Sequence, residues 1–187
     1  VGRDRGGIIK NEVHYRVQGQ NLVRLDNSSI LTLGSVGLDN YDVSLDYSYD
    51  RLAIVSAGSL YYYNGFDNIV SVSDADLGGG IRSVIYVDGY FMVNDAQSIV
   101  VTDLADPTSI NPLKYGSAEV DPDEIQCLCK VRNEPVAVGR YTCEFFANVG
   151  GSLFPFQRIP GALVSKGAIG RRCATKFMDS VRSEEHT

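Results

Sequence analysis

The sequence predicts an all-β protein, built as a β-propeller-like repeat of about four four-stranded blades that form an incomplete propeller. Three observations support this class. No window carries apolar residues at helical spacing over three turns. Many short runs rich in Val, Ile, Tyr and Phe are separated by Gly, Asn, Asp and Pro, which is typical of strands and turns. One strand–turn–strand pattern also recurs about every 40 residues, as propeller blades do.

Four valines mark the repeat: Val17, Val55, Val93 and Val138. Each ends an apolar run that is followed by a few turn-forming or polar residues and then by a second apolar or aromatic run. The spacings are 38, 38 and 45 residues. A period of this length with several strands in each unit indicates blades of a propeller.

The repeat divides the chain into expected units. We expect an N-terminal strand or arm at 1–9, units near 10–42, 43–80, 81–122 and 123–160, the start of a further unit at 161–180, and a flexible tail at 181–187. Hairpin turns are predicted at 49–51, 87–89 and 132–134, where Asp-Gly and Asn favour the positive φ of tight turns. The Pro-containing stretch 106–122 predicts an outer edge strand near 112–116 and a connection, because Pro removes a ladder donor.

Three consecutive tyrosines follow the second valine. Successive side chains of a strand point to opposite faces, so Tyr61 and Tyr63 should face one neighbouring blade and Tyr62 the other. A blade with neighbours on both sides has no polar face, which explains why its strands read as unbroken apolar runs. We therefore interpret the tyrosines as filling space between blades.

Composition limits the possible functions. The 187 residues carry a net charge of −6, which argues against a protein whose main task is to grip nucleic acid by its phosphates. No stretch approaches the roughly 20 apolar residues that span a bilayer. The start, VGRDRGG, lacks the apolar core of a signal peptide, which predicts synthesis in the cytoplasm. It also lacks Met, so we expect the chain to be part of a longer one.

The four cysteines are expected to be reduced and mostly buried. They are Cys127, Cys129, Cys143 and Cys173. Their spacing offers neither the C-x-x-C pairs nor the His partners of a zinc site. Two cysteines two residues apart are also poorly placed for a disulfide.

Two acidic patterns are candidates for chemistry. The stretch SDADLGGG at 73–80 could hold calcium through Ser73, Asp74 and Asp76, or it could be a plain loop between blades, which we favour. Acidic residues also recur at every fourth position, as Asp42, Asp46 and Asp50. They could be paired carboxylates of a glycosidase or, as we expect, the solvated edge of a strand.

No catalytic, cofactor-binding or metal-binding residue is assigned from the sequence. Neither histidine, His14 or His186, lies in a context that suggests a nucleophile and its base. A basic group gathers late in the chain: Lys166, Arg171, Arg172 and Lys176. It could face DNA phosphates or an acidic neighbouring subunit, or it could form a solvated surface, which we favour. Between the first two, the acidic composition favours the subunit contact.

A set of weak motifs, in a fixed order, extends the analysis to a family. They are YRV at 15–17 with Leu22, VTDL at 101–104 with DP at 106–107, YGSAE at 115–119 leading to PD at 122–123, VG at 138–139 before CEFF at 143–146, and KGAIG at 166–170 running to CATKFMDS at 173–180. Together they resemble the packaged-DNA stabilisation proteins of short-tailed bacteriophages, which are tail accessory factors. The resemblance runs from about residue 6 to residue 180.

The resemblance implies a structural, non-enzymatic virion protein. Such a subunit would assemble in the host cytoplasm on the portal and head-to-tail adaptor rings, and the full-length protein would form a ring of six. In the virion tail it would help to close the portal channel after DNA packaging and carry the tail needle and tailspikes. It implies neither sequence-specific nucleic-acid binding nor membrane contact. Family members are much longer than this chain. The alternatives are a propeller enzyme acting on carbohydrate and a general protein-interaction scaffold.

Overall fold

The computed structural model describes residues 2–26, 29–66, 68–74, 77, 79–104, 106–117 and 123–184. These residues form four four-stranded antiparallel sheets and one two-stranded hairpin, with no α-helix. Within each sheet, strands that are consecutive in the sequence are neighbours. The all-β prediction is confirmed.

We call the sheets blades 1 to 4. Blade 1 is β1 (Asp4–Lys10), β2 (Val13–Gln18), β3 (Asn21–Asp26) and β4 (Ser29–Ser35). Blade 2 is β5 (Ser44–Tyr47), β6 (Leu52–Ser56), β7 (Ser59–Tyr63) and β8 (Val70–Ser71). Blade 3 is β9 (Ser83–Val87), β10 (Tyr90–Asn94), β11 (Ser98–Thr102) and β12 (Ile110–Ser117). Blade 4 is β13 (Ile125–Val131), β14 (Glu134–Gly139), β15 (Cys143–Asn148) and β16 (Phe156–Val164), and the terminal hairpin is β17 (Ala174–Phe177) and β18 (Ser180–Ser183).

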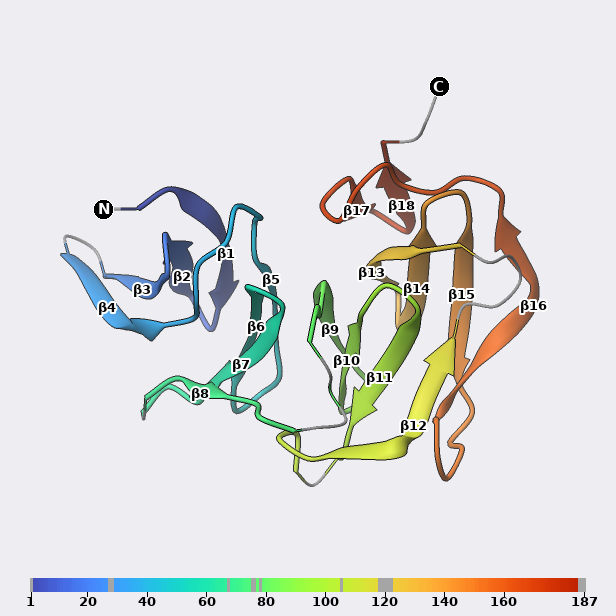
Figure 1. The fold of residues 1–187 in the computed structure, drawn as a ribbon, viewed down its shortest axis with the longest axis horizontal. Helices are drawn as coiled ribbons and strands as arrows, with labels where there is room; N and C mark the ends of the chain where they lie inside the picture. Colours follow the sequence, from blue (N-terminus) through green and yellow to red (C-terminus); the bar gives the residue numbers. More distant parts are fainter. Residues whose placement is uncertain are drawn as a thin grey trace.

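The blades are arranged around a common axis (Figure 1). The first strand of each blade lies nearest the axis and contacts the first strand of the next, in the series β1, β5, β9, β13 and β17. The last strands, β4, β8, β12 and β16, lie at the periphery. The N-terminal blade and the terminal hairpin lie on either side of a gap, so the arc does not close into a ring. The structure is therefore the incomplete propeller that the repeat predicts.

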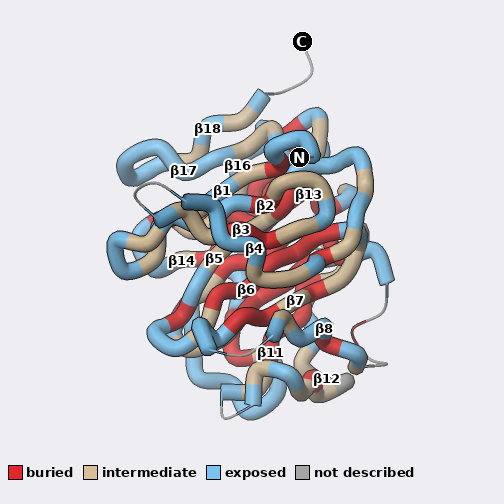
Figure 2. Tube along the Cα trace, turned by 90° about the vertical axis from the view of Figure 1, so that its left-hand side faces the viewer, coloured by how far each residue is buried: buried red, intermediate tan, exposed pale blue. Residues whose placement is uncertain are grey.

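Each junction between neighbouring blades is an apolar layer. Buried residues are concentrated in the middle of the strands, where blades face each other (Figure 2). Tyr63 packs in the layer between blades 1 and 2, where its ring centroid lies 6.1 Å from that of Tyr15, and Tyr61 flanks the same layer. Tyr62 packs in the next layer, 5.2 Å from the ring centroid of Phe91. The predicted alternation of the three tyrosines is confirmed.

The turns and the edge strand also follow the sequence. The β9–β10 turn has positive φ at Asp88 (49°) and Gly89 (90°), and the β13–β14 turn has it at Arg132 (55°). A Cβ on Gly89 would also lie only 2.7 Å from the side chain of Leu104. Glycine is therefore favoured here both by the positive φ and by the lack of space. β12 is the edge strand of blade 3 and includes the segment expected at 112–116.

The two ends of the chain are more regular than the units drawn from the sequence. Residues 4–10 form β1, which pairs with β2 as the inner strand of blade 1. Residues 181–183 of the expected tail belong to β18, because Val181 pairs with Lys176 and packs against blade 4. The last three residues lie outside the described part of the chain.

The hydroxyl of Tyr62 gives the first testable prediction. This oxygen is buried, and no hydrogen-bond partner for it is found in the described part of the chain. Tyr62→Phe should therefore leave the free energy of unfolding unchanged or raise it by up to about 2 kcal/mol, since a buried polar group without a partner is removed. Tyr62→Ala should lower it by about 3–5 kcal/mol through the cavity it leaves. Urea unfolding at pH 7 measures both, and Tyr49→Ala, at a side chain that is 95% exposed, is the neutral control.

The same residue gives stability a dependence on alkaline pH. Burial raises the pKa of Tyr62 above its usual range in the folded state. Because the pKa of Tyr62 is higher in the folded than in the unfolded protein, the contribution of Tyr62 to stability is fully present below about pH 10, the pKa of an unfolded tyrosine. This contribution is lost as the pH rises further. The wild type should therefore lose more stability than Tyr62→Phe between pH 9 and pH 11. Parallel loss in the two proteins, or a large destabilisation of Tyr62→Phe at pH 7, would contradict this assignment.

Candidate functional site: the arginine cluster at the propeller axis

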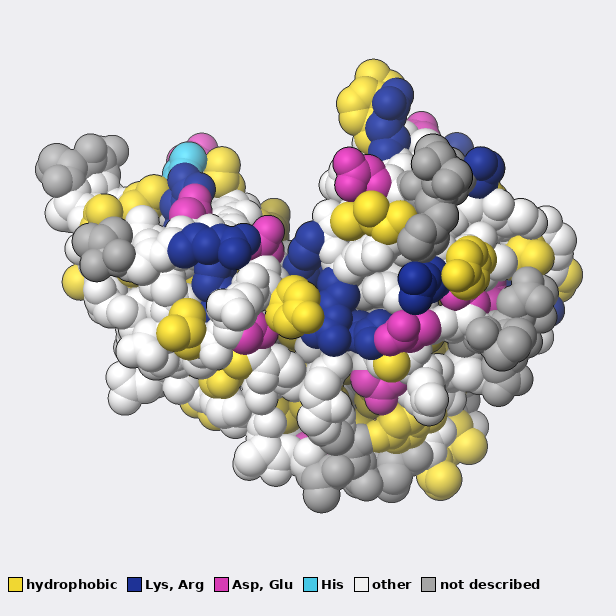
Figure 3. Space-filling model, turned by 45° about the horizontal axis from the view of Figure 1, so that its top comes forward, with side chains coloured by type: hydrophobic (Ala, Val, Ile, Leu, Met, Phe, Trp, Pro, Cys, Tyr) yellow, Lys and Arg dark blue, Asp and Glu magenta, His cyan; other side chains and the backbone are white. Residues whose placement is uncertain are grey.

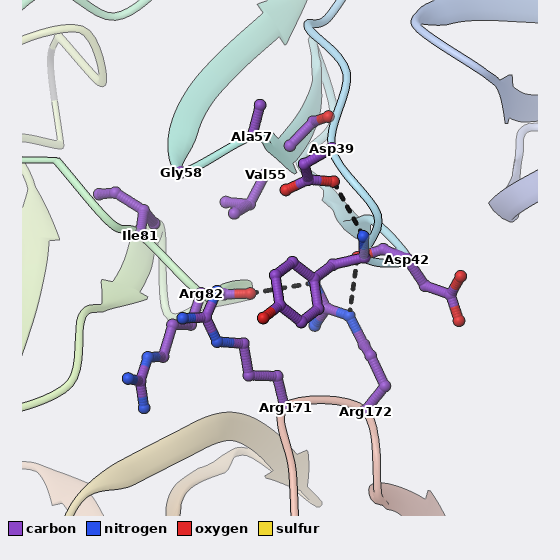
Figure 4. A pocket seen from close by; sticks show the side chains of 11 residues that line it. Asp39, Asp42, Val55, Ala57, Gly58, Ile81, Arg82, Arg171 and Arg172 are labelled. Atoms are coloured by element: carbon purple, nitrogen blue, oxygen red, sulfur yellow. Dashed lines mark hydrogen bonds between the residues drawn. The ribbon is translucent and has the colours of Figure 1, made fainter.

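One end of the axis gathers charged residues from segments far apart in the sequence. The connections that lead into β5, β9 and β17 meet there beside β1. We call this group the axial cluster: Arg3, Arg5, Asp39, Tyr41, Asp42, Arg82, Arg171 and Arg172. Figure 4 shows the part of it around Arg82, Arg171 and Arg172.

Arg5 is the most deeply buried member, with 2% of its surface exposed. Its Nε donates to the carbonyl oxygen of Tyr41 at 2.8 Å. One terminal nitrogen donates to the carbonyls of Gly19 (3.0 Å) and Gly37 (3.1 Å), and the other pairs with the carboxylate of Asp39. A buried guanidinium is tolerated when its donors are satisfied in this way. Arg5 thereby joins blade 1 to the connection that leads into blade 2.

Arg82 performs a similar role one junction further on. It lies just before β9, is 9% exposed, and donates from one terminal nitrogen to the carbonyl of Ile125 at 2.7 Å. The other terminal nitrogen pairs with Glu124, and this hydrogen bond lowers the pKa of the Glu124 carboxyl. Blade 3 is thus tied to the start of blade 4.

Arg172 connects the segment before the terminal hairpin to blades 2 and 3. Its Nε donates to the carbonyl of Asp42 at 3.2 Å, and a terminal nitrogen donates to the carbonyl of Arg82 at 3.0 Å (Figure 4). Next to it, the guanidinium of Arg171 lies 4.8 Å from the ring centroid of Tyr41. The side chain of Arg172 remains partly open to solvent while making these contacts. The chain therefore reaches across the axis and is held at this end.

The space inside the cluster is too small for a ligand. The hollow lined by Tyr41, Arg82, Arg171 and Arg172 has a volume of about 10 Å³, which is room for about one water molecule. In the space-filling view, Lys and Arg side chains gather in the gap between the two ends of the arc (Figure 3). The geometry is that of a joint between chain segments.

The basic group predicted from the sequence is divided by the structure. Arg171 and Arg172 belong to the axial cluster, whereas Lys166 and Lys176 are exposed. Arg172 is exposed, as the expected solvated surface requires, but two of its donors are also bound to carbonyls of the connections that lead into blades 2 and 3. Sequence reasoning missed Arg5 and Arg82. Their positions just inside or before an inner strand carry no periodic signal, and their partners lie 14 to 43 residues away.

The three aspartates that recur at every fourth position, from Asp42 to Asp50, do not share a solvated edge. Asp46, in β5, accepts a hydrogen bond from the backbone N–H of Tyr86 at 2.6 Å and lies 3.5 Å from Nζ of Lys130, so it links blades 2, 3 and 4. Asp42 pairs with Arg3 at 2.5 Å at the axial end. Asp50 lies beyond the other end of β5. The expected edge is wrong for Asp46 because β5 is the strand nearest the axis and faces the next blade.

Asp50 belongs to the β5–β6 turn. Its carboxylate accepts from Nε (2.9 Å) and a terminal nitrogen (2.6 Å) of Arg51. The hydrogen bond from Arg51 lowers the pKa of Asp50 to about 2. This ion pair is local to the turn and does not approach Asp42, so the two carboxylates do not form the pair that a glycosidase needs.

The cysteines lie beneath the terminal hairpin, and all four are free thiols. Cys127, Cys129 and Cys143 are buried in the layer between blade 4 and the hairpin, and Cys173 is half-buried. Burial raises the pKa of Cys143 to about 12, and its thiol donates to the carbonyl of Lys166 at 2.9 Å. The prediction of reduced, mostly buried thiols is confirmed.

The remaining candidates are dispersed. Asp74 accepts a hydrogen bond from the backbone N–H of Ile110 at 3.0 Å, while Asp76 lies outside the described residues. His14 is on β2 in blade 1, and His186 is likewise not described. In the described ranges, no three His, Cys, Asp or Glu side chains group as metal ligands. No helix of this part is long and apolar enough to cross a membrane.

These features define a class of protein: an open β-propeller whose charged axial residues join segments together. The chain matches the sequence model of a phage stabilisation family, described as bacteriophage P22 Gp10, β-propeller, over residues 1–183. It belongs to this family and is therefore a phage structural protein, as the motif order indicated. A search of curated proteins finds no match.

Solved structures share the fold at low identity. Virginiamycin B lyase from Staphylococcus aureus is 12% identical with a TM-score of 0.66, and the match covers 95% of this chain and 61% of the lyase. The computationally designed Ika8 protein is 13% identical (TM-score 0.62; 97% and 55%). PorZ of the Porphyromonas gingivalis type-IX secretion system is also 13% identical (TM-score 0.60; 97% and 25%). The chain thus spans less than two thirds of each of these proteins.

The bonds made by Arg172 predict how firmly the hairpin is held. In a Cys173→Ser background, Arg172→Ala should raise the rate at which Ellman's reagent modifies the buried thiols by about tenfold. Two hydrogen bonds at roughly 0.5–1.5 kcal/mol each are lost, and 1.4 kcal/mol is a factor of ten. Lys176→Ala, in the hairpin itself, is the matched control and should react at the parental rate. Equal rates for Arg172→Ala and the control would show that Arg172 does not hold the hairpin.

Proposed function

We propose that this protein acts in the virion tail, where it helps to close the portal channel after DNA packaging. In this proposal it joins the portal and head-to-tail adaptor ring during assembly in the host cytoplasm, and it serves as a platform for the tail needle and tailspikes. Family membership supports the setting. The axial cluster is the observation that supports closure of the channel. Arg172 crosses the axis to two blades, and the remaining hollow holds about one water molecule.

The closure is mechanical. The most deeply buried axial cations, Arg5 and Arg82, are engaged by carboxylates and backbone carbonyls, so they are not directed at phosphate. The net charge of −6 repels a polyanion at long range. A protein with these properties holds DNA back as a barrier, without sequence-specific binding.

In the same proposal, the full-length protein associates into a ring of six subunits on the portal. The faces that border the gap, on blade 1 and on the terminal hairpin, are available for such contacts. Ile9, on blade 1, is 53% exposed, and Phe177, on the hairpin, is 46% exposed. Light scattering on the full-length protein and on this chain reports the association directly.

An enzyme is the second candidate, because virginiamycin B lyase shares the fold. A catalytically inactive variant of that lyase replaces a histidine, H270A. At 12% identity the likeness concerns the fold alone. The one described histidine here, His14, is exposed on β2. Turnover of a glycan panel or of quinupristin by the purified chain would favour the enzyme over the structural role.

The closure predicts a phenotype in the assembling phage. In infected cells that make no functional copy of this protein, heads should package DNA and then lose it, because nothing blocks the channel. Electron cryo-microscopy should show mostly empty heads, and supplying the full-length protein in trans should restore filled ones. Full-length Arg172→Ala should restore fewer filled heads than Lys176→Ala. Heads that stay filled without the protein would refute the closure.

A further inference from the structure

Charge is distributed unevenly along this acidic chain. Residues 165–183 contain five cationic side chains and one acidic one, a net charge of +4, although the whole chain carries −6. The rest of the chain therefore carries −10. We call 165–183 the basic segment; it includes the terminal hairpin and the loop that leads to it. This stretch is mainly basic, although it contains Asp179 and is followed by Glu184 and Glu185. A mainly basic stretch in an acidic chain favours a contact surface.

Arginines of this segment stack on exposed aromatic rings. The guanidinium of Arg171 lies 4.8 Å from the ring centroid of Tyr41, and that of Arg182 lies 4.4 Å from the centroid of Phe177. Tyr41 is 55% exposed and Phe177 is 46% exposed. A third pair, Arg140 on Tyr141 at 5.8 Å, lies alongside, because the backbone of Arg140 contacts Gly167. Exposed aromatic and arginine residues are the types enriched in protein interfaces.

Stacking prepares a guanidinium to bind carboxylates. The N–H donors of a guanidinium lie in its own plane, where they match the two oxygens of a carboxylate, and a ring beneath the group does not occupy them. Within the described ranges, no carboxylate lies within 4.0 Å of Arg171 or Arg182. These two cations are therefore held in place while their charge is not neutralised by an ion pair.

The hairpin directs one of these pairs away from the body of the protein. Ala174 and Val181 pack against blade 4. Residues alternate between the faces of a strand, so Phe177 and Arg182 lie on the opposite face. In Figure 3, Lys and Arg side chains accompany hydrophobic ones at the gap between the ends of the arc.

We propose that the basic segment is a docking surface for an acidic, Asp/Glu-rich segment of a neighbouring protein. The stacked arginines would bind the carboxylates of the acidic segment, and the aromatic rings would contact the methylene groups of its Asp and Glu side chains. A short acidic segment can stay within the basic segment, whereas a long polyanion such as DNA would also meet the net charge of −10 on the rest of the chain. Because one face of each ring is covered by an arginine, stacking with nucleic-acid bases is restricted. The inference goes beyond channel closure and does not depend on it.

The test uses fluorescein-labelled decaglutamate and fluorescence anisotropy at low salt. The double variant Arg171→Glu/Arg182→Glu should bind the peptide at least tenfold more weakly than the wild type. Arg171→Lys/Arg182→Lys, which keeps the charge but loses the forked donors, should bind about threefold more weakly. Arg132→Glu, in an exposed turn at the opposite end of blade 4, changes the net charge by as much as single Arg182→Glu and is its matched control; it should stay within twofold of the wild type. Single Arg182→Glu, outside the axial cluster, should show a partial loss with unchanged unfolding by urea.

Three results would overturn the proposal. Equal weakening by Arg132→Glu would mean that the peptide senses only overall charge. Tighter binding of a 20-base-pair DNA duplex, lost in the double variant, would assign the segment to nucleic acid. Self-association that the double variant abolishes, without decaglutamate binding, would assign it to a second copy of this chain. Channel closure is measured separately by filled heads, so either proposal can fail alone.

Discussion

The packing of each blade's apolar face against the next blade is the interaction on which the rest of the structure depends. Every residue of β6, from Leu52 to Ser56, is buried, because blade 2 is covered on both sides. A fully buried Leu, Ile or Phe contributes roughly 1.5–3 kcal/mol, so each layer of several such residues outweighs any single polar contact in the fold. The layers also fix which strands lie near the axis, and thereby place the connections that enter β5, β9 and β17 at one end of it.

The arginines at that end solve a problem that apolar layers leave open. Connections between blades carry backbone carbonyls with no strand partner, and such groups are costly when they are buried without a hydrogen bond. Arg5 satisfies three carbonyls and Arg172 satisfies two, each from segments that are distant in the sequence. A planar guanidinium with five donors suits this task better than an ammonium group does. The same bonds fill the axial end, so one arrangement joins the blades and leaves a hollow of only about 10 Å³.

The sequence predicted the parts of this structure that depend on local pattern. The blade repeat, the turns at 87–89 and 132–134 and the alternation of Tyr61, Tyr62 and Tyr63 follow from strand periodicity and turn chemistry, which act over a few residues. The axial joint depends on which residues meet across blades, as when Asp46 meets Tyr86 forty positions away. Periodicity has no information about such pairs, and for this reason Arg5, Arg82 and the role of Asp46 were missed or misread.

A structural role explains why the charged residues are arranged as they are. Arg5 and Arg82, the most deeply buried axial cations, are bound to carboxylates and carbonyls, and the hollow of the axial cluster measures about 10 Å³. Arg171 and Arg182 make no ion pair with any described residue and lie over exposed rings, in the loop before the terminal hairpin and in the hairpin itself. The buried arginines therefore hold blades together, whereas Arg171 and Arg182 keep their charge nearer the surface. Both uses depend on the same chemistry, because a planar guanidinium can satisfy several carbonyls when it is buried and can lie over an aromatic ring when it is exposed.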